Sequence, residues 1–566
     1  MRITRSLYPI CQIAFFATLL LESCKSKGAA SEQDAIVATP GQMNEKVSGF
    51  IKELLGKSVL VDNLSGDTIE LRQPELTSLI YQNNSYAPAW SDQQLWKPVA
   101  DSLYEFISAS KLFGLFPEDY HFKDIEAIRA KMVADSAGQA ERKNAALWTE
   151  ADVMLTDAFV QIIKDLKLGR LPNDSITLRK DSVLEDEFYL NQFNELNKTG
   201  SVIKISESLE PRQKGYKELK RGIKKFLENA DYKEYTFVPS SKDDPIKYRK
   251  LLQKRLYESR YISFDSVAAD SAQLAVAVKK FQKDNGLTVD GVAGEGTLRV
   301  LNTSDREKFI RIAISLDKYK LLPEEMPSKY IWVNASGNFM EVVENEETKL
   351  VSKVICGKPK TRTPVLTSAI STLITYPQWV PPSSIIRKEI LPAVKKNPGY
   401  LAKKGFSLLD SKGEEVDPYS VDWSKYSKGI PYRVVQGSGD ANALGIMKFY
   451  FDNKYSVYLH DTNQRYLFGN PMRSLSHGCV RVQEWEPLAW YILRNDDLGT
   501  EEKTEARIDS VKTWLQKKQK RNIAIRKKLP VFIRYITCEG KDGNIVFFDD
   551  PYNEDKVLRE THFASK

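Results

Sequence analysis

Histidine and cysteine are scarce in this sequence, with four and five of them among 566 residues. Structural zinc sites prefer paired short spacings such as C-x2-C or H-x3-H. Neither Cys356 nor Cys538 has a cysteine or histidine at such a spacing. The sequence also lacks a glycine-rich phosphate loop or another nucleotide-binding motif. No metal or other cofactor is therefore predicted.

Charge of one sign is also not concentrated in a block of the kind that nucleic-acid binders carry. The 83 basic and 75 acidic residues are spread along the chain and leave a formal net charge of +8. No nucleic-acid partner is predicted, and weak attraction to an anionic wall or membrane surface is the most that this charge supports. The chain is too long for one core, and its ordinary content of 42% hydrophobic and 28% charged residues predicts three or four domains.

Only the N-terminus carries a long apolar run. Residues 1–5 include two arginines, and residues 7–21 are nearly all apolar but too few for a comfortable membrane span. This pattern predicts an export signal peptide over residues 1–23. Leu and Ser stand three and one residues before Cys24, as in a lipobox, where Cys24 would be lipidated and anchor the protein to the membrane. Glu22 is atypical of that motif, so a plain signal peptide is the alternative. Both predict an exported protein of the periplasm or cell envelope.

Residues 24–46 are rich in small and polar residues and predict a flexible tether. From residue 47 to 243 the pattern is mostly helical. Apolar residues recur at helical spacing between Leu155 and Leu166, and the run ends at Gly169 and Pro172. This region predicts a helical domain with its own core.

Two further domains are predicted after it. Residues 244–305 hold three apolar helical stripes around the turn signal Asp290-Gly291, which predicts a small three-helix unit. Residues 306–555 contain many segments rich in β-branched and aromatic residues and predict a mostly antiparallel β domain. Residues 383–440 interrupt these strands, and long irregular insertions are usually lids. The predicted fold class is multidomain α+β, with a tail at 556–566.

Residues 455–482 contain two of the four histidines of the chain, His460 and His477, together with Cys479. Residues 455–459 alternate and predict a strand that ends at His460, whereas residues 476–482 predict a tight turn into a second short strand. A thiol is a useful nucleophile only as the thiolate, and a neighbouring imidazole lowers its pKa. The pattern predicts Cys479 as nucleophile beside His460. Gly478 allows the turn, so that its N–H and that of Cys479 could point at an oxyanion.

Three other interpretations of Cys479 stay open. The side chain can be an inert buried hydrophobe. With His460 and His477 it has the ligand types of a zinc site. In an exported chain it can also form a disulfide. If Cys11 and Cys24 belong to the leader, however, three cysteines remain, and this odd number suits one free working thiol.

Two separated blocks of this stretch resemble a known signature. YLHDT at 458–462 and SHGCVRV at 476–482 resemble the motif of the L,D-transpeptidases, with their YkuD-like catalytic domain, and specifically the large YcbB type. Residues 81–90 and 114–120 resemble the scaffold domain of that type. Residues 278–302 resemble a peptidoglycan-binding domain, for which a spacer without ligand is the alternative. The segment 433–439 departs from the family's Arg-Gln pairing before Pro-Gly.

The resemblance implies roles for individual residues. Cys479 would be the nucleophile, and His460 the general base and acid, oriented by the backbone carbonyl of Asp461. His477 would shape the pocket, and Arg481 could fork onto a substrate carboxylate. The catalytic candidates are Cys479, His460, His477 and Gly478, and the substrate-binding candidates are Tyr458, Arg481, Trp379, Ser476 and Asp461. For Trp379 a structural role is the alternative.

The resemblance also implies the substrate. The donor would be a peptidoglycan tetrapeptide, which loses D-Ala to form a thioester, and the amine of an acceptor stem peptide would then complete a 3-3 cross-link. Covalent inhibition by carbapenems is expected, and no cofactor is needed. The alternatives are an L,D-carboxypeptidase or endopeptidase that trims stem peptides, and a non-catalytic wall anchor that binds peptidoglycan.

Overall fold

The computed structural model describes residues 35–56, 60–62, 68–134, 141–173, 176, 183–239, 244–263, 270–285, 287–496 and 498–566. The predicted signal peptide and Cys24 lie outside these residues. The chain folds as two compact units, one of the residues up to Tyr104 with Tyr120–Gln161 and one of Glu105–Asp119 with Ile162–Lys566. No helix among the described residues has both the length and the hydropathy needed to cross a membrane.

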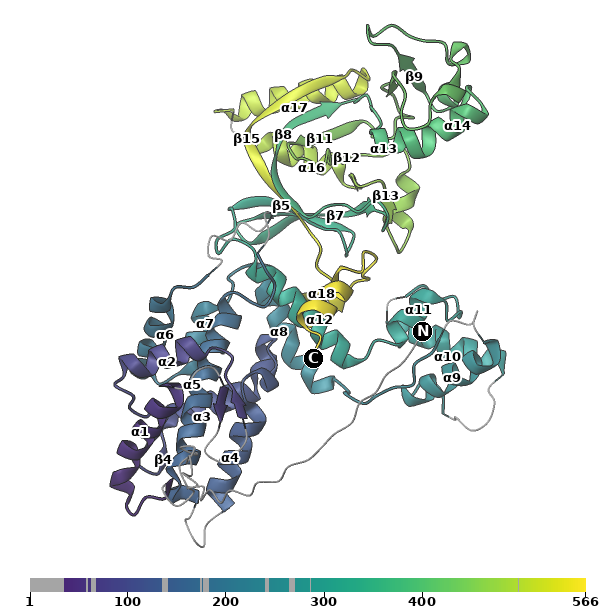
Figure 1. Ribbon diagram of the computed structural model, residues 1–566. Coiled ribbons are helices and arrows are strands. Elements are labelled where there is room, and N and C mark those ends of the chain that lie inside the picture. Colours follow the sequence, from purple (N-terminus) through teal and green to yellow (C-terminus); the bar gives the residue numbers. More distant parts are fainter. Residues whose placement is uncertain are drawn as a thin grey trace, which may run out of the picture. The chain divides into compact units, whose positions relative to one another are not determined.

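The first unit is mainly helical (Figure 1). Its elements, some of which run on into the second unit, are α1 (Met43–Gly56), β1 (Leu60–Asp62), β2 (Thr68–Glu70), α2 (Pro74–Asn83), β3 (Ser91–Asp92), β4 (Leu95–Trp96), α3 (Pro98–Ser108), α4 (Phe122–Ala134) and α5 (Ala145–Lys167). Two buried carboxylates on α5 hold the surrounding segments. Asp152 accepts hydrogen bonds from the Tyr81 hydroxyl at 2.6 Å and the Trp90 N–H at 3.0 Å, and Asp157 lies 2.8 Å from His121 Nε2. Partners of this kind are what make buried carboxylates tolerable.

The helices of the second unit that follow α5 are α6 (Asp186–Thr199), α7 (Val202–Leu209), α8 (Lys214–Asn229), α9 (Pro245–Glu258), α10 (Ser271–Asp284), α11 (Glu295–Leu301) and α12 (Asp305–Lys320). Helix α8 packs against the C-terminal hairpin of β16 (Cys538–Lys541) and β17 (Asn544–Phe547), which turns at Asp542 and Gly543 with positive φ. Helix α18 (Glu554–His562) packs on α12 through Lys318, which lies 2.9 Å from Asp555. Most of the predicted tail is therefore part of α18.

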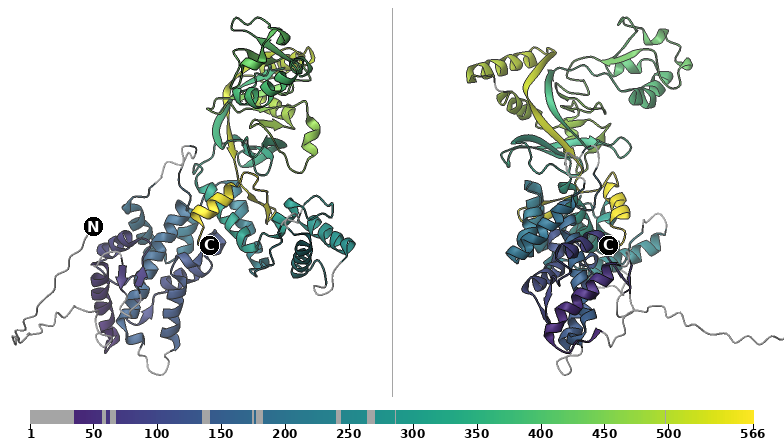
Figure 2. Two further views of the ribbon diagram at one scale, coloured as in Figure 1. Left: turned by 45° about the vertical axis from the view of Figure 1, so that its right-hand side comes forward. Right: turned by 60° about the vertical axis from the view of Figure 1, so that its left-hand side comes forward.

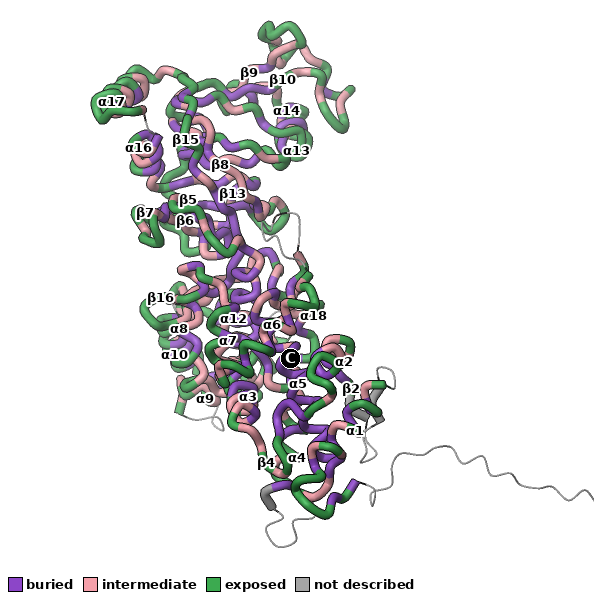
Figure 3. The backbone as a smooth tube through the Cα atoms, turned by 90° about the vertical axis from the view of Figure 1, so that its left-hand side faces the viewer, coloured by how far each residue is buried: buried purple, intermediate pink, exposed green. Residues whose placement is uncertain are grey.

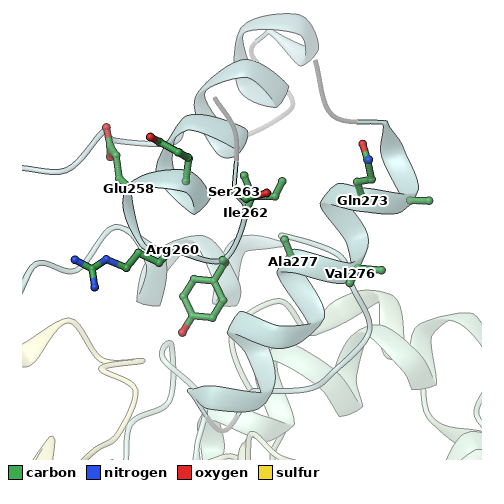
Figure 4. A pocket seen from close by; sticks show the side chains of 10 residues that line it. Glu258, Arg260, Ile262, Ser263, Gln273, Val276 and Ala277 are labelled. Carbon is green, nitrogen blue, oxygen red and sulfur yellow. The ribbon is translucent and has the colours of Figure 1, made fainter. Parts of the chain in front are cut away.

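Helices α9, α10 and α11 share one small core. It contains the residues of the predicted apolar stripes, namely Leu252, Leu256, Leu274, Val278, Phe281, Leu298 and Leu301. A cavity of about 930 Å³ lies between the end of α9 and the start of α10, where Ile262 and Ser263 face Val276 and Ala277 (Figure 4). No candidate catalytic or substrate-binding residue lines this cavity.

The remaining part of the second unit is a nine-stranded sheet in the order β13-β7-β14-β12-β11-β8-β15-β5-β6. The strands are β5 (Lys329–Asn334), β6 (Phe339–Glu344), β7 (Glu347–Gly357), β8 (Leu366–Thr375), β11 (Met447–Phe451), β12 (Leu459–His460), β13 (Ser474–Ser476), β14 (Val480–Val482) and β15 (Arg521–Arg534). The pairs β13–β7, β12–β14 and β15–β5 are parallel and the others antiparallel. Because β6 also pairs with β7, the sheet curls back on itself.

Apolar side chains on one face of this sheet form the main core of this part of the second unit. Phe449, Leu459 and Val480 are fully buried there. Helices α16 (Trp485–Arg494) and α17 (Glu501–Gln516) cover this face, and α17 presents its outer side to solvent (Figures 2 and 3). On the opposite face, Trp332 of β5 and Phe532 of β15 pack in a second apolar core with α8 and α12. Polar side chains lie on that face at β11, β12 and β14.

The insertion between β8 and β11 folds around a core of its own. It contains α13 (Ser383–Ile385), a π-helical turn at Ile386–Ile390, α14 (Leu391–Lys396), α15 (Tyr400–Lys403) and the hairpin of β9 (Phe406–Leu409) with β10 (Arg433–Gln436). Val394, Leu401 and Trp423 are buried in that core. The predicted fold class, a multidomain α+β protein with a mostly antiparallel catalytic sheet and a capping insertion, is confirmed.

Candidate active site

Three adjacent strands place three basic side chains in one row. In the register of β11, β12 and β14, Lys448 lies opposite His460, and His460 lies opposite Arg481. Side chains alternate between the faces of a strand. Because Leu459 and Val480 point into the core, the row lies on the polar face.

Cys479 and Tyr458 immediately precede β14 and β12, so each lies two residues from a member of the row and on the same face. The Val480 N–H donates to the Tyr458 carbonyl at 3.1 Å and fixes the two segments side by side. The predicted strand at 455–459 is shorter than expected. The Asn453 side chain accepts from the Val457 N–H and holds a turn there, in which Ser456 has a φ of +54°.

The turn between β13 and β14 is held by hydroxyl groups. Ser476 Oγ donates to the Cys479 carbonyl at 2.6 Å and accepts from the Gly478 N–H at 3.1 Å. Thr363 Oγ1 donates to the Gly478 carbonyl at 2.8 Å. The predicted oxyanion role of the Gly478 N–H is therefore corrected, because Ser476 Oγ takes up this donor. Ser476 itself is buried and shapes the turn rather than facing a substrate.

Gly478 has a φ of +123°, which side chains other than glycine rarely adopt. We expect Gly478→Ala to cost about 1–3 kcal/mol of stability and to lower activity by about 10- to 100-fold, because the strained turn displaces Cys479. Thermal unfolding and product formation measure the two effects. Gly429→Ala is the matched control, since nothing lies within 4 Å of its added Cβ and its φ is unstrained. Equal behaviour of both variants would contradict the role of this turn.

His460 is 4% exposed, and its Nδ1 donates to the backbone carbonyl of Asp461, which is the orienting contact that the resemblance implied. Burial, followed by the positive charge of Arg481 and to a smaller extent that of Lys448, lowers the pKa of His460 to about 3. Its imidazole is thus neutral at neutral pH, the form that a general base needs.

The side chain of Asp461 is not free for a substrate. Its carboxylate is buried, accepts from the Ile446 N–H at 3.0 Å and pairs with Arg465 at 2.8 Å. A Cβ on Gly445 would lie 2.2 Å from the same carboxylate. The substrate-binding role predicted for Asp461 is therefore replaced by a structural one, because its side chain joins β11 to β12.

The sulfur of Cys479 is surrounded by donors from Tyr458. The Cys479 thiol donates to the Ser456 carbonyl at 3.9 Å. The N–H and the hydroxyl of Tyr458 lie beside the sulfur and lower the pKa of the thiol, and the Trp379 side chain lowers the pKa of the Tyr458 hydroxyl. Burial raises the pKa of the Cys479 thiol, whereas the Tyr458 donors and the charges of Lys448 and Arg481 lower it. Burial and the neighbouring sulfur hold the pKa of Tyr458 well above its usual value, so the hydroxyl keeps its proton. Among the described residues, no hydrogen bond joins Cys479 directly to His460.

Two contacts tie the capping insertion to the site. Trp379 exchanges two backbone hydrogen bonds with Gln436 at 2.7 and 3.1 Å, and its ring lies 5.9 Å from that of Phe406. His477 Nε2 lies 2.5 Å from Glu389 Oε1 in the π-helical turn. His477 therefore faces the insertion rather than the sulfur.

Arg481 is half-buried and donates to Gln464 Oε1 at 2.9 Å. Among the described residues, its guanidinium makes no further hydrogen bond, and the predicted contact with a substrate carboxylate stays a prediction. In the part of the chain that the structure describes, no three His, Cys, Asp or Glu side chains gather around a possible metal position.

Sequence reasoning missed Lys448 and Glu389. The alternation of MKFYF at 447–451 was a usable signal for Lys448, because a lone lysine between buried apolar residues must leave the core on the opposite face. Glu389 is 88 residues from His477 and had no such signal.

Three family models match parts of the chain. The YkuD family model, described as an L,D-transpeptidase catalytic domain, matches residues 328–496. A scaffold domain model matches residues 75–223, and a "Putative peptidoglycan binding domain" matches residues 247–301. The chain contains these three domains. The matched ranges lie within the predicted boundaries 47–243, 244–305 and 306–555, which stay predictions.

One similar protein, from Haemophilus influenzae, is described as a "Putative L,D-transpeptidase". It is 35% identical over 248 residues, which are 44% of this chain and 48% of that protein, so the match spans about half the length of this relative. The solved structure described as the Ldtfm-avibactam carbamoyl enzyme matches 30% of this chain and 53% of its own, at 13% identity and a TM-score of 0.13. That score is too low to support an argument.

Proposed function

We propose that this chain is an L,D-transpeptidase that forms 3-3 cross-links between peptidoglycan stem peptides through a thioester on Cys479. The observation that carries the proposal is the placement of the Cys479 sulfur beside the N–H and hydroxyl of Tyr458, which favour the thiolate, on the sheet face that also holds His460 and Arg481. This face belongs to the matched catalytic domain. A half-buried thiol with such donors is placed to react rather than to fill a core.

The proposed reaction has two stages. The Cys479 thiol gives its proton to His460, by way of a water molecule or after a side-chain rotation, and the thiolate attacks the carbonyl that joins the donor's diamino acid to its terminal D-Ala. The C–N bond breaks, and the D-Ala amine leaves with the proton from His460. An acceptor amine then attacks the thioester and loses a proton to His460, and the thiolate leaves. No cofactor takes part in these steps.

Peptidoglycan-related domains support a location in the cell envelope. Within it, we propose export by the N-terminal signal peptide and membrane attachment through a lipid on Cys24. Peptidoglycan is accordingly the proposed partner, as tetrapeptide donor and as acceptor stem. We propose the YcbB type because the scaffold domain and the peptidoglycan-binding domain precede the catalytic one.

The ratio of products tests which reaction the thioester undergoes. The capping insertion meets the site through Trp379 and Glu389 and is expected to restrict water while an acceptor amine enters. We therefore expect mass spectrometry of muropeptides to show more 3-3 dimers than free tripeptides when acceptor stems are abundant. An acceptor concentration series with tetrapeptide donor held constant is the control. Tripeptide in excess at every acceptor concentration would instead identify an L,D-carboxypeptidase.

A further inference from the structure

Lys448 projects onto the catalytic face from the middle of β11. Its neighbours Met447 and Phe449 are fully buried in the core, whereas Lys448 is half-buried and lies opposite His460 in the strand register. No described carboxylate lies within ion-pair distance of its ammonium. A half-buried lysine that keeps no acidic partner is unfavourable unless another group interacts with its charge.

The ring of Tyr458 is one such group. Lys448 Nζ lies 3.7 Å from the ring centroid of Tyr458, within the distance of a favourable cation–π contact. The hydroxyl of this tyrosine lies beside the Cys479 sulfur and lowers the pKa of the thiol. Lys448 therefore contacts the aromatic ring of Tyr458, the residue that lies beside the Cys479 sulfur.

The electrostatic coupling between Lys448 and Cys479 is reciprocal. The positive charge of Lys448 lowers the pKa of Cys479, and the negative charge of the thiolate raises the pKa of Lys448, although burial lowers it more. Lys520 also faces Lys448 and lowers its pKa by like-charge repulsion. The positive charge of Arg481, at the other end of the row of basic side chains, also lowers the pKa of Cys479.

We propose that Lys448 is a positioning residue that stabilises Cys479 as the thiolate, through its charge and through the Tyr458 ring that it fixes. The inference rests on the proposed role of Cys479 as nucleophile. The same charge also opposes a proton on His460, after burial and the charge of Arg481, so Lys448 favours the anionic sulfur without favouring a protonated base. Lys448 contacts neither the substrate nor the reacting carbonyl in this scheme.

Thiol reactivity tests this proposal without any substrate. In the full chain, alkylation of Cys479 by iodoacetamide is followed against pH by peptide-mapping mass spectrometry. Lys448→Met is expected to raise the apparent pKa of Cys479 by about one unit and to slow alkylation at pH 7 about tenfold, since the thiolate fraction falls in proportion. Lys448→Arg keeps the charge and is expected to react within about threefold of the parent.

Lys520→Met is the matched control because it removes the same charge beside Lys448, whereas Lys448 and Arg481 are the main charges that lower the pKa of Cys479. It is expected to react like the parent. Cys356 and Cys538 are fully buried and serve as internal references, which stay unmodified while the fold is intact. The proposal is overturned if Lys448→Met titrates like the parent, if Lys448→Arg is as slow as Lys448→Met, or if Lys520→Met slows alkylation equally.

The coupling between Lys448 and Cys479 and the proposed transpeptidase function are tested by separate results. If Lys448→Met shifts the titration of Cys479 but the parent forms no thioester product, the transpeptidase assignment fails and the coupling stands. If the parent forms 3-3 dimers and the titration does not move, the coupling fails alone.

Discussion

Cys479→Ala is expected to abolish cross-linking of purified tetrapeptide muropeptides, with a loss of at least about a thousandfold, because residual binding groups cannot replace the nucleophile. The substitution removes one half-buried sulfur atom that donates to the Ser456 carbonyl and lies beside Tyr458, and that is not part of the apolar core. The thermal unfolding midpoint is therefore expected to stay within a few degrees of the parent, which corresponds to about 1 kcal/mol or less. Chromatography with mass spectrometry measures the dimers.

A second cysteine provides the matched control. Cys538 is fully buried beside Ser315 Oγ, and burial raises the pKa of its thiol to about 12. Cys538→Ala is expected to lower stability by about 1–2 kcal/mol through lost packing and to keep the activity. Cys479→Ala is thus expected to lose activity and keep its stability, whereas Cys538→Ala is expected to lose stability and keep its activity.

Covalent labelling separates an enzyme from a wall anchor with an inactive domain. Incubation with a carbapenem is expected to add one adduct mass to the parent and to Cys538→Ala, but none to Cys479→Ala. A parent that gains no adduct favours the non-catalytic anchor. Activity retained in Cys479→Ala together with a large stability loss would show that the thiol is a core residue instead.

Local sequence patterns were sufficient for the elements that carry the site. The alternation of apolar residues and the glycine of the SHGCVRV block predicted a turn and a short strand, and β14 begins at Val480 as expected. In the structure the two blocks lie side by side, with Leu459 in register with Val480. These features could be predicted because the side chains of a strand and the φ of a turn are set by residues within a few positions.

The charge environment of the site could not be predicted in the same way. The register that places Lys448 beside His460 depends on how Phe449 and Leu459 pack in the shared core, which is decided by all the strands together. The glycine at 478 predicts a turn in which its N–H could point at an oxyanion, and only the structure shows that Ser476 Oγ accepts from that N–H. Contacts across the sheet, rather than local propensity, determine which donors remain available.

His460→Asn is the other substitution with a large expected effect. The asparagine amide can still donate to the Asp461 carbonyl, so the loop keeps its contact while the second ring nitrogen is lost. Activity is expected to fall by about 100- to 10,000-fold, the usual contribution of a general acid–base group. Alkylation of Cys479 should change much less, because Tyr458 and Lys448 still act on the sulfur. His562→Asn, on α18, is the histidine control and is expected to retain the parent's activity.

The free energy of unfolding of His460→Asn is also expected to depend on pH differently from that of the parent. The sign of the difference follows from the pKa of His460. This pKa is about 3 in the folded protein, whereas an unfolded histidine titrates near about 6.5. As the pH falls below about 6.5, the unfolded chain therefore binds a proton that the folded chain does not, and the parent loses roughly 1.4 kcal/mol per pH unit from this group until about pH 3. His460→Asn lacks this term. Its free energy of unfolding, measured with urea from pH 7.5 to pH 5, should fall less steeply than that of the parent by roughly 2 kcal/mol at the acid end. Parallel curves for the two proteins would mean that His460 is accessible to protons when folded, and the argument that it rests as a neutral base would then fail.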